Sequence, residues 1–565
     1  MSSQPGASLR RDRALATGLG TLAAGAWSAA RNLNGAPVTF DEDEVGYFNF
    51  ARATAELIYD LKPLRLVEQL VGTPRPPLVG LTDALTLLLL PAQPALLAFA
   101  RVFWTAFLLW QASGLAVDLL SNSGASERVQ RRAAACAVGL LATAPIVLQL
   151  GSSLMYEVPL AAIAVVAVRE LLRLGREPST MAAVRAGLAC GLGLLIKWTF
   201  PVAIVGPVLV LAGRTLRAGR SLRPWFLAAG VALALAAPWY LATASRTLSF
   251  VLDVSTGEGA RAYGAADRSV LEEVGFYVPV LLGSLLWWPL AGAAFWGLFR
   301  SVRARVDGAF VLLAGVLAPP LLFSLLANKE VRYLLPMVPL LAVMGGVGLA
   351  RMDGLRRGAV SALGVAAVLS LGAGLPLQAS QPIQADDRSF GPIDVRWDPS
   401  AGAAAVPVDV RLATPLGPLV LWSRGDVGFF YRHGVPDGLP FDEIVGRAEE
   451  TNPGGPRDAV VLSPETWIWT PLWTLALERR GWTAWRTSQC DAFIVGEAAY
   501  FLSVEPPGAP TVHCREIAER AAAGFEALRP DLQVLDRWSF EGRRLTLWVH
   551  RERLYANAHG ADEDP

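Results

Sequence analysis

The chain has 565 residues, of which 53% are hydrophobic and 18% are charged, and its mean hydropathy is +0.39. This composition is too apolar and too poor in charge for a single water-soluble domain of that size, so it predicts a polytopic membrane protein. The formal net charge is only +1. That value excludes a global electrostatic field that would attract nucleic acid or acidic partners, so any electrostatic function must be local.

Apolar runs that are long enough, or nearly so, to span a bilayer recur along the first two thirds of the chain. We expect about eleven membrane-spanning helices from these runs. They lie near residues 14–30, 95–120, 133–150, 158–172, 186–199, 200–213, 225–241, 276–299, 309–326, 333–350 and 359–378. A further apolar piece, 77–90, is expected to lie along the outer interface, because a crossing there would reverse the side of every later arginine cluster.

Arginines gather at alternate connections, which the positive-inside rule assigns to the cytoplasm. The clusters are Arg10 to Arg13, Arg128 to Arg132, Arg173 to Arg185, Arg214 to Arg223, Arg300 to Arg305 and Arg351 to Arg357. We therefore expect a protein of the plasma (inner) membrane with a cytoplasmic N-terminus and with residues beyond 379 outside the cytoplasm. Alternatively, the first apolar run is a cleaved signal peptide, which would leave the later topology unchanged.

Composition changes from a membrane pattern to a soluble pattern near residue 379. We expect a membrane domain over 1–378, with an acidic first outer loop over 31–94, and an extracytoplasmic α/β domain over 379–565. Short strand-like runs occur at 419–422, 459–462, 492–495 and 545–549, and helix-like stretches at 465–480 and 514–528. Cys490 and Cys514 are candidates for a disulfide bond in this outer part.

The first outer loop begins with four consecutive acids, Asp41 to Glu44. Carboxylates crowded beside a membrane face are costly, which indicates a chemical function. Two other interpretations remain open: capping of the following helix, and an oxygen-ligand site for a divalent metal ion. A histidine base or zinc site in the membrane part is excluded, because all four histidines lie in the last third of the chain, at His433, His513, His550 and His559.

Several short motifs follow one another on the side of the membrane expected to face outward. They are Asp43-Glu44-Val45-Gly46-Tyr47, Arg75-Pro76-Pro77, Tyr156-Glu157-Val158-Pro159, the glycine-rich run 191–197 that ends in Lys197, Pro238-Trp239-Tyr240, and the segment 329–336 from Lys329 to Pro336. Their order and sidedness resemble the GT-C membrane glycosyltransferases, most closely glycosyltransferase family 39, the protein O-mannosyltransferases, and the lipid A aminoarabinose transferases.

The resemblance implies a helical GT-C fold that transfers a sugar, with inversion, from a polyprenyl-phosphate donor to a hydroxyl of a protein, lipid or polysaccharide. By the matched motifs, Asp43 is the expected base, Glu44 supports it, and Glu157 orients the acceptor or the sugar. The expected ligands of the donor phosphate are Arg75, Lys197, Lys329, Arg332 and Tyr333, with Tyr47 in a supporting position. Protein cations of this kind replace a metal, so no cofactor is expected.

Two positions depart from the family pattern. Glutamate stands at 157 where aspartate is usual, and glycine stands at 46 where the aminoarabinose transferases carry arginine. The first departure changes the reach of the acid by one methylene, and the second removes one phosphate contact and makes aminoarabinose itself a doubtful substrate.

Simpler interpretations of the same residues are also open. Arg75 could be an ordinary interfacial anchor, Glu157 a solvated turn residue, and Arg332 a partner of Glu330 alone. Two other functions compete with sugar transfer. A lipid or solute transporter, or a flippase, would place charges near span centres and carry inverted repeats, and we see neither in the sequence. A membrane-anchored binding or assembly protein would work through its C-terminal domain.

Overall fold

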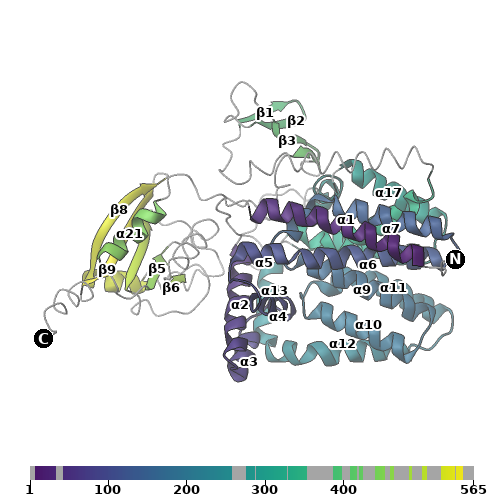
Figure 1. Cartoon of the computed structure of the whole chain (residues 1–565), viewed down its shortest axis with the longest axis horizontal. Helices are drawn as coiled ribbons and strands as arrows, with labels where there is room; N and C mark the ends of the chain where they lie inside the picture. The colour runs from purple at the N-terminus through teal and green to yellow at the C-terminus, as the bar shows by residue number, and fades with distance from the viewer. Residues whose placement is uncertain are drawn as a thin grey trace.

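The computed structural model describes residues 7–33, 42–256, 271, 275–286, 288–326, 329–352, 386–397, 407–415, 419–423, 440–451, 458–462, 483–486, 499–505, 523–540 and 543–551. Helices make up most of the described chain up to residue 352, and strands dominate from residue 386 onward (Figure 1).

A bundle of long helices forms the first part of the chain. Its members are α1 (Ala7–Asn32), α6 (Val102–Ser121), α7 (Glu127–Ala142), α9 (Glu157–Arg176), α10 (Thr180–Leu194), α11 (Phe200–Arg217), α12 (Arg223–Ala242), α17 (Trp288–Arg303), α18 (Ala309–Phe323) and α19 (Val338–Leu349). Each of the first ten expected spans overlaps one of these helices, and the last, 359–378, lies outside the described residues. By length and hydropathy, 4 helical stretches of the described residues suffice to cross a membrane singly: Pro94–Ser121, Phe200–Arg217, Arg223–Ala242 and Val331–Leu349.

Several of the expected spans are interrupted, which corrects their description as single continuous helices, and three of them are described next. The run 133–150 is divided between α7 and α8 (Pro145–Gly151), which meet at a bend of 67°. The bend falls where Pro145 removes a backbone donor. The run 276–299 consists of α16 (Tyr277–Val280), the π-helix η2 (Leu281–Leu285) and α17, and the 3-10 helix η3 (Val331–Met337) precedes α19.

Four further helices collect at the end of the bundle away from the N-terminus (Figure 1). They are α2 (Glu42–Tyr59), α3 (Pro63–Val71), α4 (Leu78–Leu87) and α13 (Ala244–Thr256). Helix α4 has 10 residues, too few to cross a bilayer. It leads through α5 (Pro94–Ala100) into α6. The apolar piece 77–90 therefore does not cross the bundle, as the arginine pattern requires.

The arginine-rich connections lie together at the other end of the bundle. Arg131 of α7 is 2.9 Å from Asp12 of α1, and Arg176 of α9 is 2.8 Å from Asp307, which precedes α18. The first pair places the start of α1 beside the start of α7, and the second places the start of α18 beside the end of α9. We call this the basic end, and the end with α2 to α4 the acidic end.

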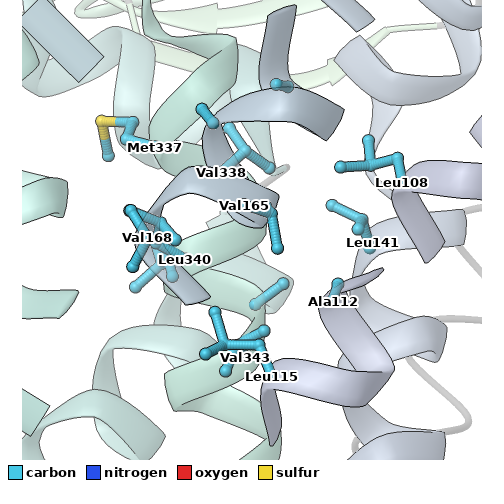
Figure 2. Close-up of a cluster of buried hydrophobic side chains, with 14 of the residues drawn as sticks. Leu108, Ala112, Leu115, Leu141, Val165, Val168, Met337, Val338, Leu340 and Val343 are labelled. Atoms are coloured by element: carbon cyan, nitrogen blue, oxygen red, sulfur yellow. The ribbon is translucent and has the colours of Figure 1, made fainter. Parts of the chain in front are cut away.

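The core of the bundle is apolar and centres on α19, all of whose residues are buried. Side chains from α6, α7, α9, η3 and α19 interdigitate in Figure 2. Because lipid is as apolar as these side chains, close packing rather than exclusion from water must hold the helices together. At the crossing of α17 and α19, a Cβ on Gly348 would lie 2.2 Å from the backbone oxygen of Gly297.

Two β-sheets follow in sequence. The first is an antiparallel meander of β1 (Asp386–Phe390), β2 (Ile393–Trp397), β3 (Pro407–Leu412) and β4 (Leu419–Ser423). The second has the order β6-β5-β7-β9-β8, with β5 (Asp458–Leu462), β6 (Thr483–Arg486), β7 (Tyr500–Glu505), β8 (Leu532–Phe540) and β9 (Arg543–His550). Strands β6, β5 and β7 are parallel, whereas β9 and β8 are antiparallel.

Three of the four strand-like runs seen in the sequence correspond to β4, β5 and β9. Residues 523–528 are helical, as expected, whereas 465–480, 492–495 and both outer cysteines lie outside the described residues. The existence of two separate sheets was not predicted. The first sheet contacts the bundle, where the indole Nε1 of Trp288 donates to the carbonyl of Leu421 at 2.9 Å.

Candidate active site

Residues 154–157, between α8 and α9, form the meeting point of the functional candidates at the acidic end. Helix α8 ends at Gly151 and α9 begins at Glu157, so Leu154 and Met155 lie between the two helices and their backbone groups can bond to other elements. The N–H of Leu154 donates to Oε1 of Glu44 at 2.7 Å, and the carbonyl of Met155 accepts from Arg101 at 2.9 Å. We call these four residues the junction segment.

Glu157 is the acid of the junction segment, and it is only 1% exposed. Its Oε1 lies 2.6 Å from Nζ of Lys197 and 3.5 Å from Nε of Arg332. Its place in the first turn of α9 also favours a negative charge, because the helix dipole is positive there. The interpretation of Glu157 as a solvated turn residue is therefore wrong.

Lys197 lies in the break between α10 and α11. The break leaves carbonyls without helical partners, and other elements supply donors. The N–H of Leu78 donates to Leu195 and the hydroxyl of Tyr240 donates to Leu194, each at 3.0 Å. These bonds hold the break against α4 and α12, so that Nζ of Lys197 faces Glu157 and lies 5.4 Å from the ring centroid of Tyr333.

Arg332 reaches the same place from η3. Its guanidinium pairs with Glu330 through Nε and Nη2, the latter at 3.0 Å from Oε1. The pairing with Glu330 that we considered as a simpler interpretation is therefore present, but Arg332 lies near Glu157 as well. Lys329 differs in that its Nζ donates to the carbonyl of Leu326 at 2.7 Å.

Arg75 is connected to the junction segment through two stacked tyrosine rings. Its guanidinium carbon lies 4.7 Å from the ring centroid of Tyr47, and that ring stacks on Tyr156 at 4.0 Å with an interplanar angle of 20°. A Cβ on residue 46 would lie 3.1 Å from Nη1 of Arg75. The glycine at 46 thus leaves room for Arg75 beside α2.

Glu44 is 1% exposed and its Oε1 accepts from the junction segment, 110 residues further along the chain. For this acid, simple helix capping does not describe the contact. Asp43 belongs to the first turn of α2, but its side chain, like that of Glu42 and all of Asp41, lies outside the described residues.

Most of the candidates taken from the sequence therefore surround one segment. The residues gathered there are Glu44, Tyr47, Arg75, Glu157, Lys197, Arg332 and Tyr333. Among the described residues, no group of three His, Cys, Asp or Glu side chains is arranged to hold a metal ion.

One buried ion pair at the acidic end was missed in the sequence. Asp83 of α4 accepts from both Nε and Nη2 of Arg101, with 3.1 Å between Nε and Oδ1. The two side chains are 1% and 3% exposed. A signal was available, because Asp83 is the sole charged residue between 76 and 100.

No protein-family model matches the chain. Several curated relatives match part of it, and the three quoted next are all named undecaprenyl phosphate-alpha-4-amino-4-deoxy-L-arabinose arabinosyl transferase. The transferase 1 of Sodalis glossinidius is 35% identical over 176 residues, the transferase 2 of Pseudomonas fluorescens 28% over 176, and that of Yersinia enterocolitica 33% over 164. The matches cover 28% to 30% of this chain and 29% to 31% of the relatives.

Solved structures match over nearly the whole chain. ArnT from Cupriavidus metallidurans, bound to undecaprenyl phosphate, has a TM-score of 0.55 at 14% identity and is matched over 95% of this chain and 98% of its own. The apo state of the same protein gives 0.54 at 15%. These likenesses confirm the expected fold class, a polytopic helical membrane protein of the GT-C type with a small sheet-containing C-terminal part.

Proposed function

We propose that this protein is a membrane glycosyltransferase that moves a sugar from a polyprenyl-phosphate donor to a hydroxyl group of an acceptor outside the cytoplasm. The observation that carries the proposal is the gathering of Arg75, Lys197 and Arg332 with Glu44 and Glu157 around the junction segment. Cations from three distant parts of the chain meet carboxylates at one end of a fold that, in ArnT, holds undecaprenyl phosphate.

The charge change in the reaction explains the need for several cations. A sugar linked to a polyprenyl phosphate is a phosphodiester with one negative charge. When the bond between the anomeric carbon and the phosphate oxygen breaks, the phosphate leaves with a second negative charge. Arg75, Lys197, Lys329 and Arg332, with the hydroxyl of Tyr333, are the proposed groups that stabilise this charge, and arginine can do so through two parallel hydrogen bonds.

The acceptor hydroxyl must lose its proton as its oxygen bonds to the anomeric carbon. Asp43 is the proposed base, with Tyr47 beside it in the same helix. Glu44 supports it by tying the start of α2 to the junction segment. Glu157 orients the sugar or acceptor through the cations that it holds. Attack opposite to the departing phosphate inverts the anomeric centre, and no step requires a metal ion.

The proposed orientation places the acidic end on the outer face of the plasma membrane and the N-terminus in the cytoplasm. It is supported by Arg131 and Arg176, which pair with Asp12 and Asp307 at the opposite end of the bundle. Residues 379–565 are then an outer domain distinct from the membrane domain 1–378, and we propose that it helps to hold a protein, lipid or glycan acceptor.

The deciding experiment measures transfer of radiolabelled sugar from synthetic polyprenyl-phosphate donors by the purified protein, with release of polyprenyl phosphate as the second product. Asp43→Asn should lower turnover by about 10²- to 10⁴-fold, the usual contribution of a general base, with donor binding intact. Asp60→Asn is the matched control, because Asp60 is exposed and pairs with Lys62. Normal turnover by Asp43→Asn would remove Asp43 as the base. Movement of intact donor across vesicles without sugar release would instead favour a flippase.

A further inference from the structure

We propose that Asp83 and Arg101 are positioning residues that set the geometry of the donor-phosphate site without touching the donor. The inference rests on the proposed function, because it concerns the placement of that site. Neither residue belongs to the motifs from which the site was first assembled.

Arg101 makes contact with two different parts of the site at once. Through Nε and Nη2 it binds both carboxylate oxygens of Asp83, on α4. Through Nη1 it donates to the carbonyl of Met155, and its guanidinium carbon lies 5.5 Å from the ring centroid of Tyr156. One planar, rigid group therefore fixes the distance between α4 and the junction segment.

Both of these elements carry candidate phosphate ligands or their partners. Arg75 precedes α4 and is separated from its first residue, Leu78, by two prolines, which restrict the chain between them. Glu157 follows Met155 in the junction segment and holds Lys197 and Arg332. A shift of α4 relative to the junction segment would thus move Arg75 away from the other two cations.

Stability alone does not explain why two charges are buried here. Taking both ions out of water is costly, and apolar residues of similar volume often replace such a pair without loss of stability. Arg101 lies where α5 ends and α6 begins, and α6 packs into the apolar core (Figure 2). The Asp83–Arg101 pair therefore links the donor-phosphate site to the packed core of the bundle.

The experiment replaces both charges together, because removal of one would leave the other buried without its partner. The variant Asp83→Leu/Arg101→Met is compared with wild type and with Asp12→Asn/Arg131→Gln, which removes a half-exposed pair at the basic end. Undecaprenyl phosphate binding, sugar transfer and thermal unfolding are measured on each. A readout independent of catalysis is acetylation, followed by mass spectrometry, of the three lysines Lys62, Lys197 and Lys329.

Lys197 reports the position of the junction segment, because its side chain is 11% exposed and paired with Glu157, whereas Lys62 is 56% exposed and serves as internal reference. We expect the double variant to unfold at about the wild-type temperature. It should transfer sugar about 100-fold more slowly, which is the effect of misplacing a reacting group by about 1 Å. It should also bind undecaprenyl phosphate more weakly. Lys197 should become more reactive relative to Lys62. The control pair should leave all four measurements unchanged.

A folded double variant with wild-type lipid binding and wild-type Lys197 reactivity would overturn the positioning role. If the double variant does not fold, Arg101→Lys decides the question, because an ammonium keeps the charge opposite Asp83 but cannot reproduce the planar fork. Faster Lys197 acetylation in that variant supports the inference, and an unchanged rate overturns it. If wild type transfers no sugar, the proposed function fails, while the acetylation result still tests the positioning role.

Discussion

Lys197 and Glu157 form an ion pair of 2.6 Å across 40 residues of sequence, and each stands at a point where a helix is interrupted or begins. Both residues thus make this contact from the end of a span. The breaks in the bundle are therefore what allow charged groups to meet at its acidic end, and irregular backbone at such a place is typical of polar sites in membrane proteins.

Glu157→Gln should lower the thermal stability of the protein without lipid and increase the stabilisation that bound undecaprenyl phosphate provides. The change removes a negative charge that faces both Lys197 and Arg332, at a cost of about 1–3 kcal/mol in stability, mainly because Lys197 loses the carboxylate it binds. A lipid phosphate can then supply the missing charge. Thermal unfolding should show a lower melting temperature without undecaprenyl phosphate and a larger increase with it.

Glu170→Gln is the control for this prediction, because Glu170 pairs with Arg173 in the half of α9 nearer the basic end. It should leave the increase caused by the lipid as in wild type. A lipid response in Glu157→Gln that is no larger than in wild type would show that phosphate and Glu157 do not share the same cations.

Arg75→Ala should weaken undecaprenyl phosphate binding by about 1–3 kcal/mol, the value of a lost charge-assisted hydrogen bond. Arg65→Ala is the matched control, since Arg65 lies on the neighbouring helix α3, is exposed and pairs with Glu68. Titration of each purified variant in detergent with undecaprenyl phosphate measures the two affinities, and only Arg75→Ala should bind more weakly than wild type. Equal affinities would assign Arg75 to membrane anchoring.

Tyr156→Ala should destabilise the acidic end through loss of the ring that stacks on Tyr47. Tyr156 is 3% exposed, and removal of a buried aromatic ring costs about 3–5 kcal/mol. Tyr156→Phe keeps the ring and should cost no more than about 1.5 kcal/mol. Chemical or thermal unfolding in detergent measures both, and equal losses would mean that the hydroxyl, not the stack, is the stabilising part.

Gly348→Val should separate α17 from α19, because even a Cβ at this position would lie 2.2 Å from the backbone oxygen of Gly297. Overpacking of this kind costs about 1–3 kcal/mol or more. Gly292→Val on α17 is the control, since no atom lies within 4 Å of a Cβ built there. Size-exclusion profiles after heating should show loss of folded protein for Gly348→Val alone, and similar losses in both variants would contradict the close crossing.

Much of the bundle was predictable because lipid imposes a minimum length of apolar sequence on every span. The arginine clusters then fixed which connections share an end, and the contact of Arg131 with Asp12 agrees with that pattern. Breaks within spans were not predicted, since apolar composition does not distinguish a π-helix or a bend at Pro145 from a regular helix. The first sheet was largely missed, because β1 is polar and carries no alternating apolar pattern.

The candidate site was predictable by residue type and position, but not by contact. Sequence motifs indicated Glu157, Lys197 and Arg332 as site residues. Their contacts depend on how α9, α10 and η3 pack against one another, and local sequence patterns do not predict that packing. Asp83 and Arg101 were missed for a related reason. Their significance lies in a contact between segments 18 residues apart, and each looks ordinary when considered alone.

The buried position of α19 has a consequence for biogenesis. Among the described residues, the α-helices that contact it most, α6, α7, α9, α17 and α18, all precede it in the chain. When the ribosome reaches Val338, the neighbours of this segment have already been synthesised. This buried helix can thus enter an environment that these five helices have already prepared, and it need not wait in lipid for any of them.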